Sequence, residues 1–214
     1  PLNRQLHIFT GRLKNKQEIK DFISKYKISF IVDATHPFAI NISKNLIAAS
    51  IDISIPIFRF ERIYRCKSNV EIISNFKGLP HEGIHNKNIL LAIGSRALCE
   101  VASFYSDLGA NIFARILATP QSICKGFSSG INHSRLAILN PNKYEGNKLE
   151  YHLCKYWNID YIICRDSGGY SQIIWDEICL KNNIKLFLIK RPEIVHNSLT
   201  FSQYDDLIKM IVQL

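Results

Sequence analysis

Short apolar runs alternate with segments of helical periodicity along most of the chain. The runs are about four to six residues long, and the segments between them repeat apolar residues on one face at intervals of three and four. This alternation is typical of repeated βα units around a mainly parallel sheet. Because the runs are apolar almost throughout, we expect helices to cover both faces of the sheet.

Eight apolar runs are predicted to be strands: residues 6–9, 28–32, 55–58, 89–93, 112–117, 136–139, 161–164 and 186–189. Apolar stripes predict helices around residues 19–26, 38–49, 97–105, 149–156, 174–179 and 204–211. Both periods weaken between residues 62 and 88, which we interpret as the link between two α/β halves. We therefore predict an N-terminal domain over residues 1–65 and a C-terminal α/β domain over residues 66–214.

The predicted fold class is α/β, with two Rossmann-like halves that contain mainly parallel sheets. A doubly wound dinucleotide domain carries a glycine-rich phosphate turn after its first strand. The ten glycines of this chain form neither G-x-G-x-x-G nor G-K-[ST]. Either the chain binds no nucleotide, or that turn belongs to an upstream segment. Because the sequence starts Pro1-Leu2-Asn3 without a methionine, we expect the first βα unit of the N-terminal half to be missing.

Composition narrows the possible functions. The 214 residues are 47% hydrophobic, which is enough for a sizeable core. No apolar run reaches the roughly 18 residues of a membrane span and no leader-like segment opens the chain, so we expect a cytoplasmic protein without a membrane partner. The net charge of +9 favours anionic partners. Because the basic residues of the chain are spread along helix faces, they predict no nucleic-acid binding. Six cysteines form no Cys-x-x-Cys pair, so neither a zinc site nor a redox dithiol is indicated.

Three turns share one design, because each follows an apolar strand and precedes a helix. They are Asp33-Ala34-Thr35-His36-Pro37, Gly94-Ser95-Arg96 and Asp166-Ser167-Gly168-Gly169. In a parallel sheet all three lie along the carboxyl edge, where free N–H groups and helix dipoles favour an anion. The alternative is that the polar residues of the first two turns only cap helices and that the glycines only make a tight turn.

Arginines follow the predicted strand at residues 55–58, in the segment Arg59-Phe60-Glu61-Arg62. Guanidinium groups pair well with carboxylates and phosphates, so these arginines are candidates for binding an anionic ligand at the same edge. The alternative is a local surface ion pair with Glu61.

Two motif matches are rejected on their context. Residues 81–85 fit H-E-x-x-H, which on a helix places two histidines on one face to bind zinc. Pro80 precedes this segment and Gly83 lies within it, so we expect an exposed linker and no metal site. The Asp-Ser-Gly-Gly segment also resembles the nucleophile segment of trypsin-like proteases, but those proteins are secreted and all-β.

A series of segments recurs in a known order and spacing: Thr10-Gly11-Arg12-Leu13, Asp33-Ala34-Thr35-His36-Pro37-Phe38-Ala39, Pro56 with Arg59-Phe60-Glu61-Arg62, Gly94 with Arg96, Ser167-Gly168-Gly169, and Arg191-Pro192. Together they resemble the precorrin-6A reductase family of cobalamin biosynthesis, and the Gly-Arg-Leu opening looks more like its cobalt-precorrin-6A branch. The Asp-Ala-Thr-His-Pro segment is the most specific part. The resemblance covers nearly the whole chain and implies a two-domain α/β oxidoreductase.

The resemblance also implies a reaction and site residues. The enzyme would use NADPH to reduce one double bond of a tetrapyrrole that carries many carboxylates. Asp33, Thr35 and His36 would bind the cofactor, and His36 would be the catalytic proton donor. Turn donors and arginines would bind the substrate: Arg59, Arg62, Gly94, Ser95, Arg96, Ser167, Gly168 and Gly169. The carboxylate of Asp166 weakens an anion site beside it unless Arg165 offsets its charge.

A different class of function stays open on the residues alone. A non-catalytic α/β module would bind a small anionic ligand at the sheet edge with the same turns and arginines. An upstream strand followed by Gly-Gly-Thr would favour the reductase over this module.

Overall fold

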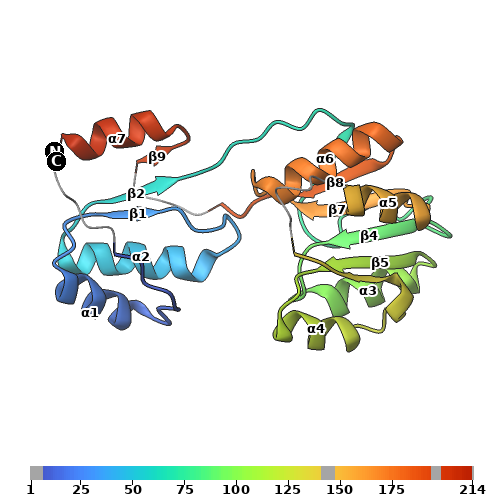
Figure 1. Ribbon diagram of the computed structural model, residues 1–214, viewed down its shortest axis with the longest axis horizontal. Helices are drawn as coiled ribbons and strands as arrows, with labels where there is room; N and C mark the ends of the chain where they lie inside the picture. Colours follow the sequence, from blue (N-terminus) through green and yellow to red (C-terminus); the bar gives the residue numbers. More distant parts are fainter. Residues whose placement is uncertain (1–6, 141–147, 194–198, 214) are drawn as a thin grey trace. The chain divides into compact units, whose positions relative to one another are not determined.

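A computed structural model of the protein describes residues 7–140, 148–193 and 199–213 (Figure 1). The chain divides into two compact units: unit 1 consists of Pro1–Glu61 and Pro192–Leu214, and unit 2 of Arg62–Arg191. The predicted C-terminal domain over residues 66–214 is therefore corrected, because the last segment of the chain returns to unit 1. The pattern of apolar residues cannot reveal this return, since it reports local periods and not strand partners.

Unit 1 is a three-stranded parallel sheet with helices on both faces. Its elements are α1 (Lys16–Tyr26), β1 (Ile31–Asp33), α2 (Ile40–Ile53), β2 (Ile57–Phe60), β9 (Thr200–Phe201) and α7 (Tyr204–Val212). The strand order is β1-β2-β9, and β9 joins the sheet by parallel pairing with β2. Helices α1 and α2 lie on one face and α7 on the other (Figure 1).

The core of unit 1 follows from side chains that alternate across the sheet. Ile31 of β1 packs toward the cluster of buried Ile19, Ile23 and Ala49 from α1 and α2. Its neighbour Val32 packs toward the opposite cluster around Leu207. This period of two is what a parallel strand covered on both faces requires.

Unit 2 is a six-stranded, fully parallel sheet. Its elements are β3 (Val70–Ile73), β4 (Asn88–Ala92), α3 (Leu98–Asp107), β5 (Asn111–Ile116), α4 (Pro120–Phe127), a short 3₁₀ helix (His133–Arg135), β6 (Leu136–Ile138), α5 (Lys148–Tyr156), β7 (Tyr161–Arg165), α6 (Tyr170–Asn182) and β8 (Lys185–Ile189). Helices α3 and α4 cover one face, and α5 and α6 the other (Figure 1). The predicted α/β class with parallel sheets is confirmed.

The strand order of unit 2 reverses at one point. The order is β3-β8-β7-β4-β5-β6, so the chain runs from β4 outward through β5 to β6. It then returns to β7, on the other side of β4, and continues outward to β8. The loops after β4 and β7 therefore diverge to opposite faces of the sheet, and ligands of doubly wound folds bind in the crevice at such a switch point.

Several elements differ from the prediction. Strand β3 lies inside the predicted link, because it is an edge strand of only four residues in which Glu71 interrupts the apolar run and Ile72 is exposed. Helix α4 and strand β9 were also missed. Residues 7–9 of the strand predicted at residues 6–9 form no strand, and residue 6 lies outside the described residues.

The H-E-x-x-H match at residues 81–85 lies in turns, so His81 and His85 do not share the helical face that a zinc motif needs.

Within the described residues, no helix has the length and apolar character that crossing a membrane demands.

The return of the C-terminal segment can be tested with Leu207, which is buried against Phe58 and Phe60 of β2. We expect Leu207→Ala to lower the free energy of unfolding by about 2–4 kcal/mol, because it leaves a cavity in this core. The matched control is Val212→Ala, near the end of the same helix, where the side chain is 79% exposed and the loss stays within about 0.5 kcal/mol. Urea denaturation measures both, and equal losses would contradict the packing described.

Candidate functional site

Asp33 and Arg59 form a buried ion pair where the first two strands of unit 1 end. Asp33 is the last residue of β1, and the register of the parallel pair places Arg59 of β2 beside it. The Arg59 Nη1 atom lies 2.9 Å from Asp33 Oδ2, and each side chain is only 1% exposed. Replacing either residue of such a pair is strongly destabilising, because the charge of the other residue then stays buried without its partner.

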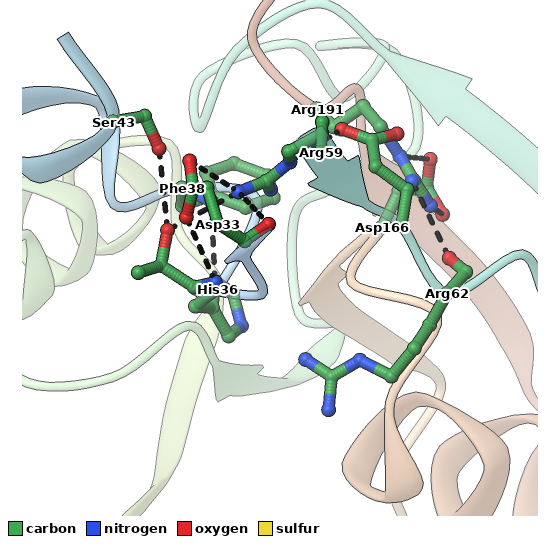
Figure 2. A network of polar contacts seen from close by, with 10 residues as sticks. Asp33, His36, Phe38, Ser43, Arg59, Arg62, Asp166 and Arg191 are labelled. Atoms are coloured by element: carbon green, nitrogen blue, oxygen red, sulfur yellow. Dashed lines mark hydrogen bonds and ion pairs between the residues drawn. The ribbon is translucent and has the colours of Figure 1, made fainter. Parts of the chain in front are cut away.

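Hydroxyl and amide groups complete this cluster, which we call the Asp33 cluster (Figure 2). The Thr35 amide donates to Asp33 Oδ1 at 3.0 Å, and Arg59 Nη1 donates to Thr35 Oγ1 at 3.2 Å. Ser43, from α2, places its Oγ 3.2 Å from Thr35 Oγ1. The Arg59 Nε atom donates to Glu61 at 3.3 Å. Among the residues that the structure describes, Arg59 Nη2 alone of the Arg59 nitrogens has no hydrogen-bond acceptor.

The Asp33 carboxylate is stabilised in its charged form. Burial acts to raise its pKa, but hydrogen bonds from Ser43 and Thr35, together with the Arg59 charge, outweigh burial and leave the pKa below its ordinary value. Asp33 and Arg59 therefore neutralise each other inside unit 1. The expectation that Arg59 binds a substrate carboxylate and that Asp33 binds the cofactor directly is corrected for this conformation, because neither side chain reaches the surface.

His36 is exposed, unlike Thr35 and Pro37 on either side of it. Its Nδ1 atom accepts a hydrogen bond from the Phe38 amide at 3.2 Å, so the neutral ring carries its proton on Nε2.

The alternative that the polar residues of the first two turns cap helices does not hold. The residue before α2 is Ala39, which makes no side-chain cap, and α3 likewise begins after Ala97.

The switch point of unit 2 brings two basic side chains together. Gly94 follows β4 with φ of 78°, and a side chain there would lie 4.0 Å from Arg165 Nη1 at the end of β7. Burial, and then the nearby Arg96 guanidinium, lower the pKa of Arg165. Arg96 is exposed. Ser95 is turned toward α4, since its Oγ donates to Ser122 Oγ at 3.2 Å. We call Gly94, Arg96 and Arg165 the switch-point site.

The Ser167–Gly169 turn uses its amide groups internally. The Ser167 and Gly168 amides both donate to the side-chain oxygen of Gln172, at 2.8 and 2.7 Å, and the Gly169 amide donates to Ser167 Oγ at 3.3 Å. The expectation that these three amides bind an anionic ligand is corrected for this conformation, because their hydrogen bonds are already made. The turn still needs glycine, since Gly168 has φ of 63°.

A second ion pair lies next to this turn. Arg191 binds Asp166 through two hydrogen bonds, from Nε at 2.9 Å and from Nη2 at 3.1 Å. Its Nη1 also donates to the main-chain oxygen of Arg62 at 3.4 Å. Arg191 therefore provides the offsetting charge for Asp166, the role that the sequence left to Arg165. Figure 2 shows the Arg62 side chain extending away from this pair.

The three predicted turns do not share one sheet edge. The turns after β4 and β7 belong to neighbouring strands of unit 2, as expected. The turn after β1 belongs to the separate sheet of unit 1. The prediction of one rim is therefore wrong for the Asp33 turn, because two sheets with the same local βα pattern cannot be told apart from one sheet without knowing the strand partners.

Three residues were not assigned a ligand or support role from the sequence: Ser43, Gln172 and Arg191. Gln172 had a usable signal, because it stands at the third position of a helix, where glutamine often bonds back to preceding amides. Ser43 and Arg191 are 8 and 25 residues away from their partners Thr35 and Asp166 in the predicted turns, and local periodicity does not report such pairs. Arg165 was considered only as a counter-charge for Asp166.

Comparisons with known proteins agree on one family. Residues 1–212 match the family described as "Precorrin-6x reductase CbiJ/CobK". A curated cobalt-precorrin-6A reductase from Synechocystis sp. is 30% identical over 206 residues, which cover 94% of this chain and 77% of the relative. The one from Methanocaldococcus jannaschii is 30% identical over 205 residues, 94% of this chain and 78% of the relative.

A solved structure shares the fold. The protein titled "CobK precorrin-6A reductase" matches with a TM-score of 0.74 and 16% sequence identity, over 95% of this chain and 80% of the other. This likeness supports the architecture of parallel sheets described above.

The buried pair predicts a specific loss on substitution. Asp33→Asn removes the fully buried counter-ion of Arg59 and leaves only the partly exposed Glu61 beside it, so we expect the free energy of unfolding at neutral pH to fall by about 3–5 kcal/mol. The control Asp52→Asn removes an exposed partner of Lys16 and Lys20 and should change little. Because the folded-state pKa of Asp33 is lowered, its stabilisation is present above the unfolded pKa of about 4 and is lost as pH falls further. Urea denaturation across pH detects this acid loss in wild type, and finding the same acid loss in Asp33→Asn would contradict the assignment.

The close approach at Gly168 gives a second prediction. A Cβ there would overlap the main-chain oxygen of Arg62, whereas a Cβ at Gly130, with a similar φ of 79°, would meet nothing within 4 Å. We expect Gly130→Ala to cost about 1 kcal/mol of unfolding free energy from backbone strain alone. Gly168→Ala should cost about 2–4 kcal/mol, because the chain must also move apart. Equal costs in thermal or urea denaturation would show that the contact with Arg62 is unimportant.

Proposed function

Because the chain belongs to the precorrin-6x reductase family CbiJ/CobK, we propose that it reduces one double bond in the macrocycle of precorrin-6A or cobalt-precorrin-6A during cobalamin biosynthesis, with NADPH as the reductant. The observation that carries the proposal for this chain is the switch-point site, where Arg96 and Arg165 stand beside Gly94 at the place where doubly wound folds bind ligands.

The chemistry of the substrate supports this assignment. A corrin precursor is fringed by carboxylates, and guanidinium groups form the strongest hydrogen bonds with carboxylates. Burial and the nearby Arg96 guanidinium disfavour the charged form of Arg165, so an anion placed near both guanidinium groups is favourable. We therefore assign Arg96 and Arg165, with the exposed Arg62, to substrate carboxylates. The names of the two relatives described above favour the cobalt-containing form of the substrate.

The residues of unit 1 fit a nicotinamide cofactor only in part. The sequence of unit 1 contains a single glycine, Gly11, so the described part offers no glycine-rich phosphate turn. Asp33 and Thr35 support the turn after β1 from within. His36 is exposed at the carboxyl end of a parallel strand, the position at which dinucleotides bind. His36, supported by the Asp33 cluster, is the residue that would contact NADPH.

Reduction of a double bond needs a hydride and a proton. NADPH supplies the hydride when bound, and the protein holds and orients the reactants. His36 carries its proton on Nε2 because Nδ1 accepts the Phe38 amide. An imidazole changes charge near neutral pH, which suits it to deliver that proton. Each role is assigned within its own unit: proton delivery to His36 in unit 1, and carboxylate binding to the arginines of unit 2.

The test is tetrapyrrole-dependent oxidation of NADPH by the full chain, followed by absorbance with precorrin-6A and with its cobalt form. We expect His36→Ala to lower kcat by about 10²–10⁴-fold, because proton delivery is lost, with the unfolding midpoint unchanged. The control His152→Ala removes an exposed histidine of α5 and should leave kcat as in wild type.

Two outcomes would count against the proposal. An unchanged kcat in His36→Ala would remove its role as proton donor. Failure of the wild-type chain to oxidise NADPH with either tetrapyrrole, while a small carboxylate still binds to the switch-point site, would favour the non-catalytic anion-binding module instead.

A further inference from the structure

The buried side chain of Gln172 forms hydrogen bonds with the Ser-Gly-Gly turn and with Cys66. It stands at the third position of α6, after the N-cap residue Gly169, and is 1% exposed. Its Oε1 accepts the amides of Ser167 and Gly168, and its Nε2 donates to Cys66 Sγ at 3.5 Å. A glutamine at this helix position commonly bonds back to the N-cap amide. Here it reaches further, to the two residues before the cap.

These two hydrogen bonds fix the path of the turn. Without an acceptor, both amides would be buried and unsatisfied, which is costly enough to change the conformation. With the acceptor in place, Gly168 keeps its left-handed conformation and its α-carbon faces the main-chain oxygen of Arg62, with no room for a Cβ. The next residue, Gly169, lies against the Arg62 guanidinium, where a Cβ would be 3.7 Å from its carbon. The turn therefore contacts Arg62 at two places: Gly168 contacts its main-chain oxygen, and Gly169 contacts its guanidinium.

Arg62 is held from a second direction as well. Arg191 is fixed by its two bonds to Asp166, and it donates to the Arg62 main-chain oxygen. The Arg62 side chain remains exposed. Within the residues that the structure describes, no carboxylate forms an ion pair with its guanidinium, which leaves the charge available for a ligand. The backbone is therefore fixed while the charged end is presented to solvent.

We propose that Gln172 is a positioning residue for substrate binding: by holding the Ser167–Gly169 turn, it sets the place of Arg62 and aims that guanidinium at a carboxylate of the tetrapyrrole. This inference rests on the proposed function, in which Arg62 binds the substrate. It assigns the Ser-Gly-Gly segment a role different from anion binding by its amides. Arg62 touches the ligand, and Gln172 acts through the turn.

The test compares two substitutions of similar size that both remove the Nε2 donor, of which one also removes the acceptor oxygen and the other keeps it. Gln172→Met removes the acceptor oxygen, and we expect the KM for cobalt-precorrin-6A to rise about tenfold with a smaller change in kcat, because a charge-assisted bond to the substrate is misplaced. Gln172→Glu keeps an acceptor oxygen, and its KM should stay below that of Gln172→Met. The control Asn182→Ala removes a hydrogen bond to Ile178 at the other end of α6 and should leave KM unchanged.

A double-substitution cycle with Arg62→Ala separates positioning from a general loss of structure. If Gln172 acts through Arg62, Gln172→Met raises KM in the wild-type background and adds nothing once Arg62 is alanine. An equal rise in both backgrounds, or a KM for Gln172→Glu no lower than for Gln172→Met, would overturn the inference while leaving the substrate role of Arg62 intact. An unchanged KM in Arg62→Ala alone would instead remove that role from the proposed function, and the inference with it.

Amide hydrogen exchange supplies a readout that needs no turnover. The Ser167 and Gly168 amides should be protected in wild type and in Gln172→Glu, and should exchange faster in Gln172→Met. If they exchange as slowly in Gln172→Met as in wild type, Gln172 does not hold the turn and the inference fails, whatever the activity shows.

Discussion

The need to satisfy buried hydrogen-bonding groups decides what lies at the strand ends of both units. Loops that follow parallel strands bring amides, carboxylates and guanidinium groups into partly buried positions, where an unmade hydrogen bond costs more than a made one gains. In unit 1 the ion pair of Asp33 with Arg59 compensates the two buried charges, and Arg59 Nη2 still lacks an acceptor among the described residues. In unit 2 it is avoided by Gln172, which accepts the two amides of the Ser-Gly-Gly turn. The polar groups that can bind a ligand are those that these internal hydrogen bonds and ion pairs do not use.

This constraint separates supporting residues from ligand-binding residues of the same chemical type. Arg59 and Arg191 are committed to aspartates of their own units. Arg62 and Arg96 are exposed, and they stand next to the turns that follow β7 and β4. The same distinction applies to glycine. Gly94 leaves space next to a guanidinium, whereas Gly168 allows two main-chain segments to approach each other.

The sequence predicts the elements of the fold better than their partners. Apolar runs that are buried on both faces, such as β4 and β7, are recognised because almost every residue is apolar. The edge strand β3 and the two-residue strand β9 are missed, since an edge position and a short length remove that signal. The return of the last segment to unit 1 is missed for a different reason. Periodicity identifies a strand, but the strand beside it is decided by tertiary packing, here that of Leu207 with Phe58 and Phe60.

For the candidate site, too, the sequence predicts the kind of turn but not the partners of its polar groups. Turn composition predicts strand-to-helix turns after β1, β4 and β7, and the structure has a turn of this kind at each place, because glycine and short polar residues are what such turns need. It cannot tell whether an amide faces a ligand or a side chain of the protein, since the acceptor for Ser167 and Gly168 is provided five and four residues later by Gln172. The net charge of +9 is equally uninformative by itself. A guanidinium becomes a candidate for substrate binding only after the carboxylates of the protein have been assigned, and it is this assignment that leads from Arg59 and Arg191 to Arg62 and Arg96.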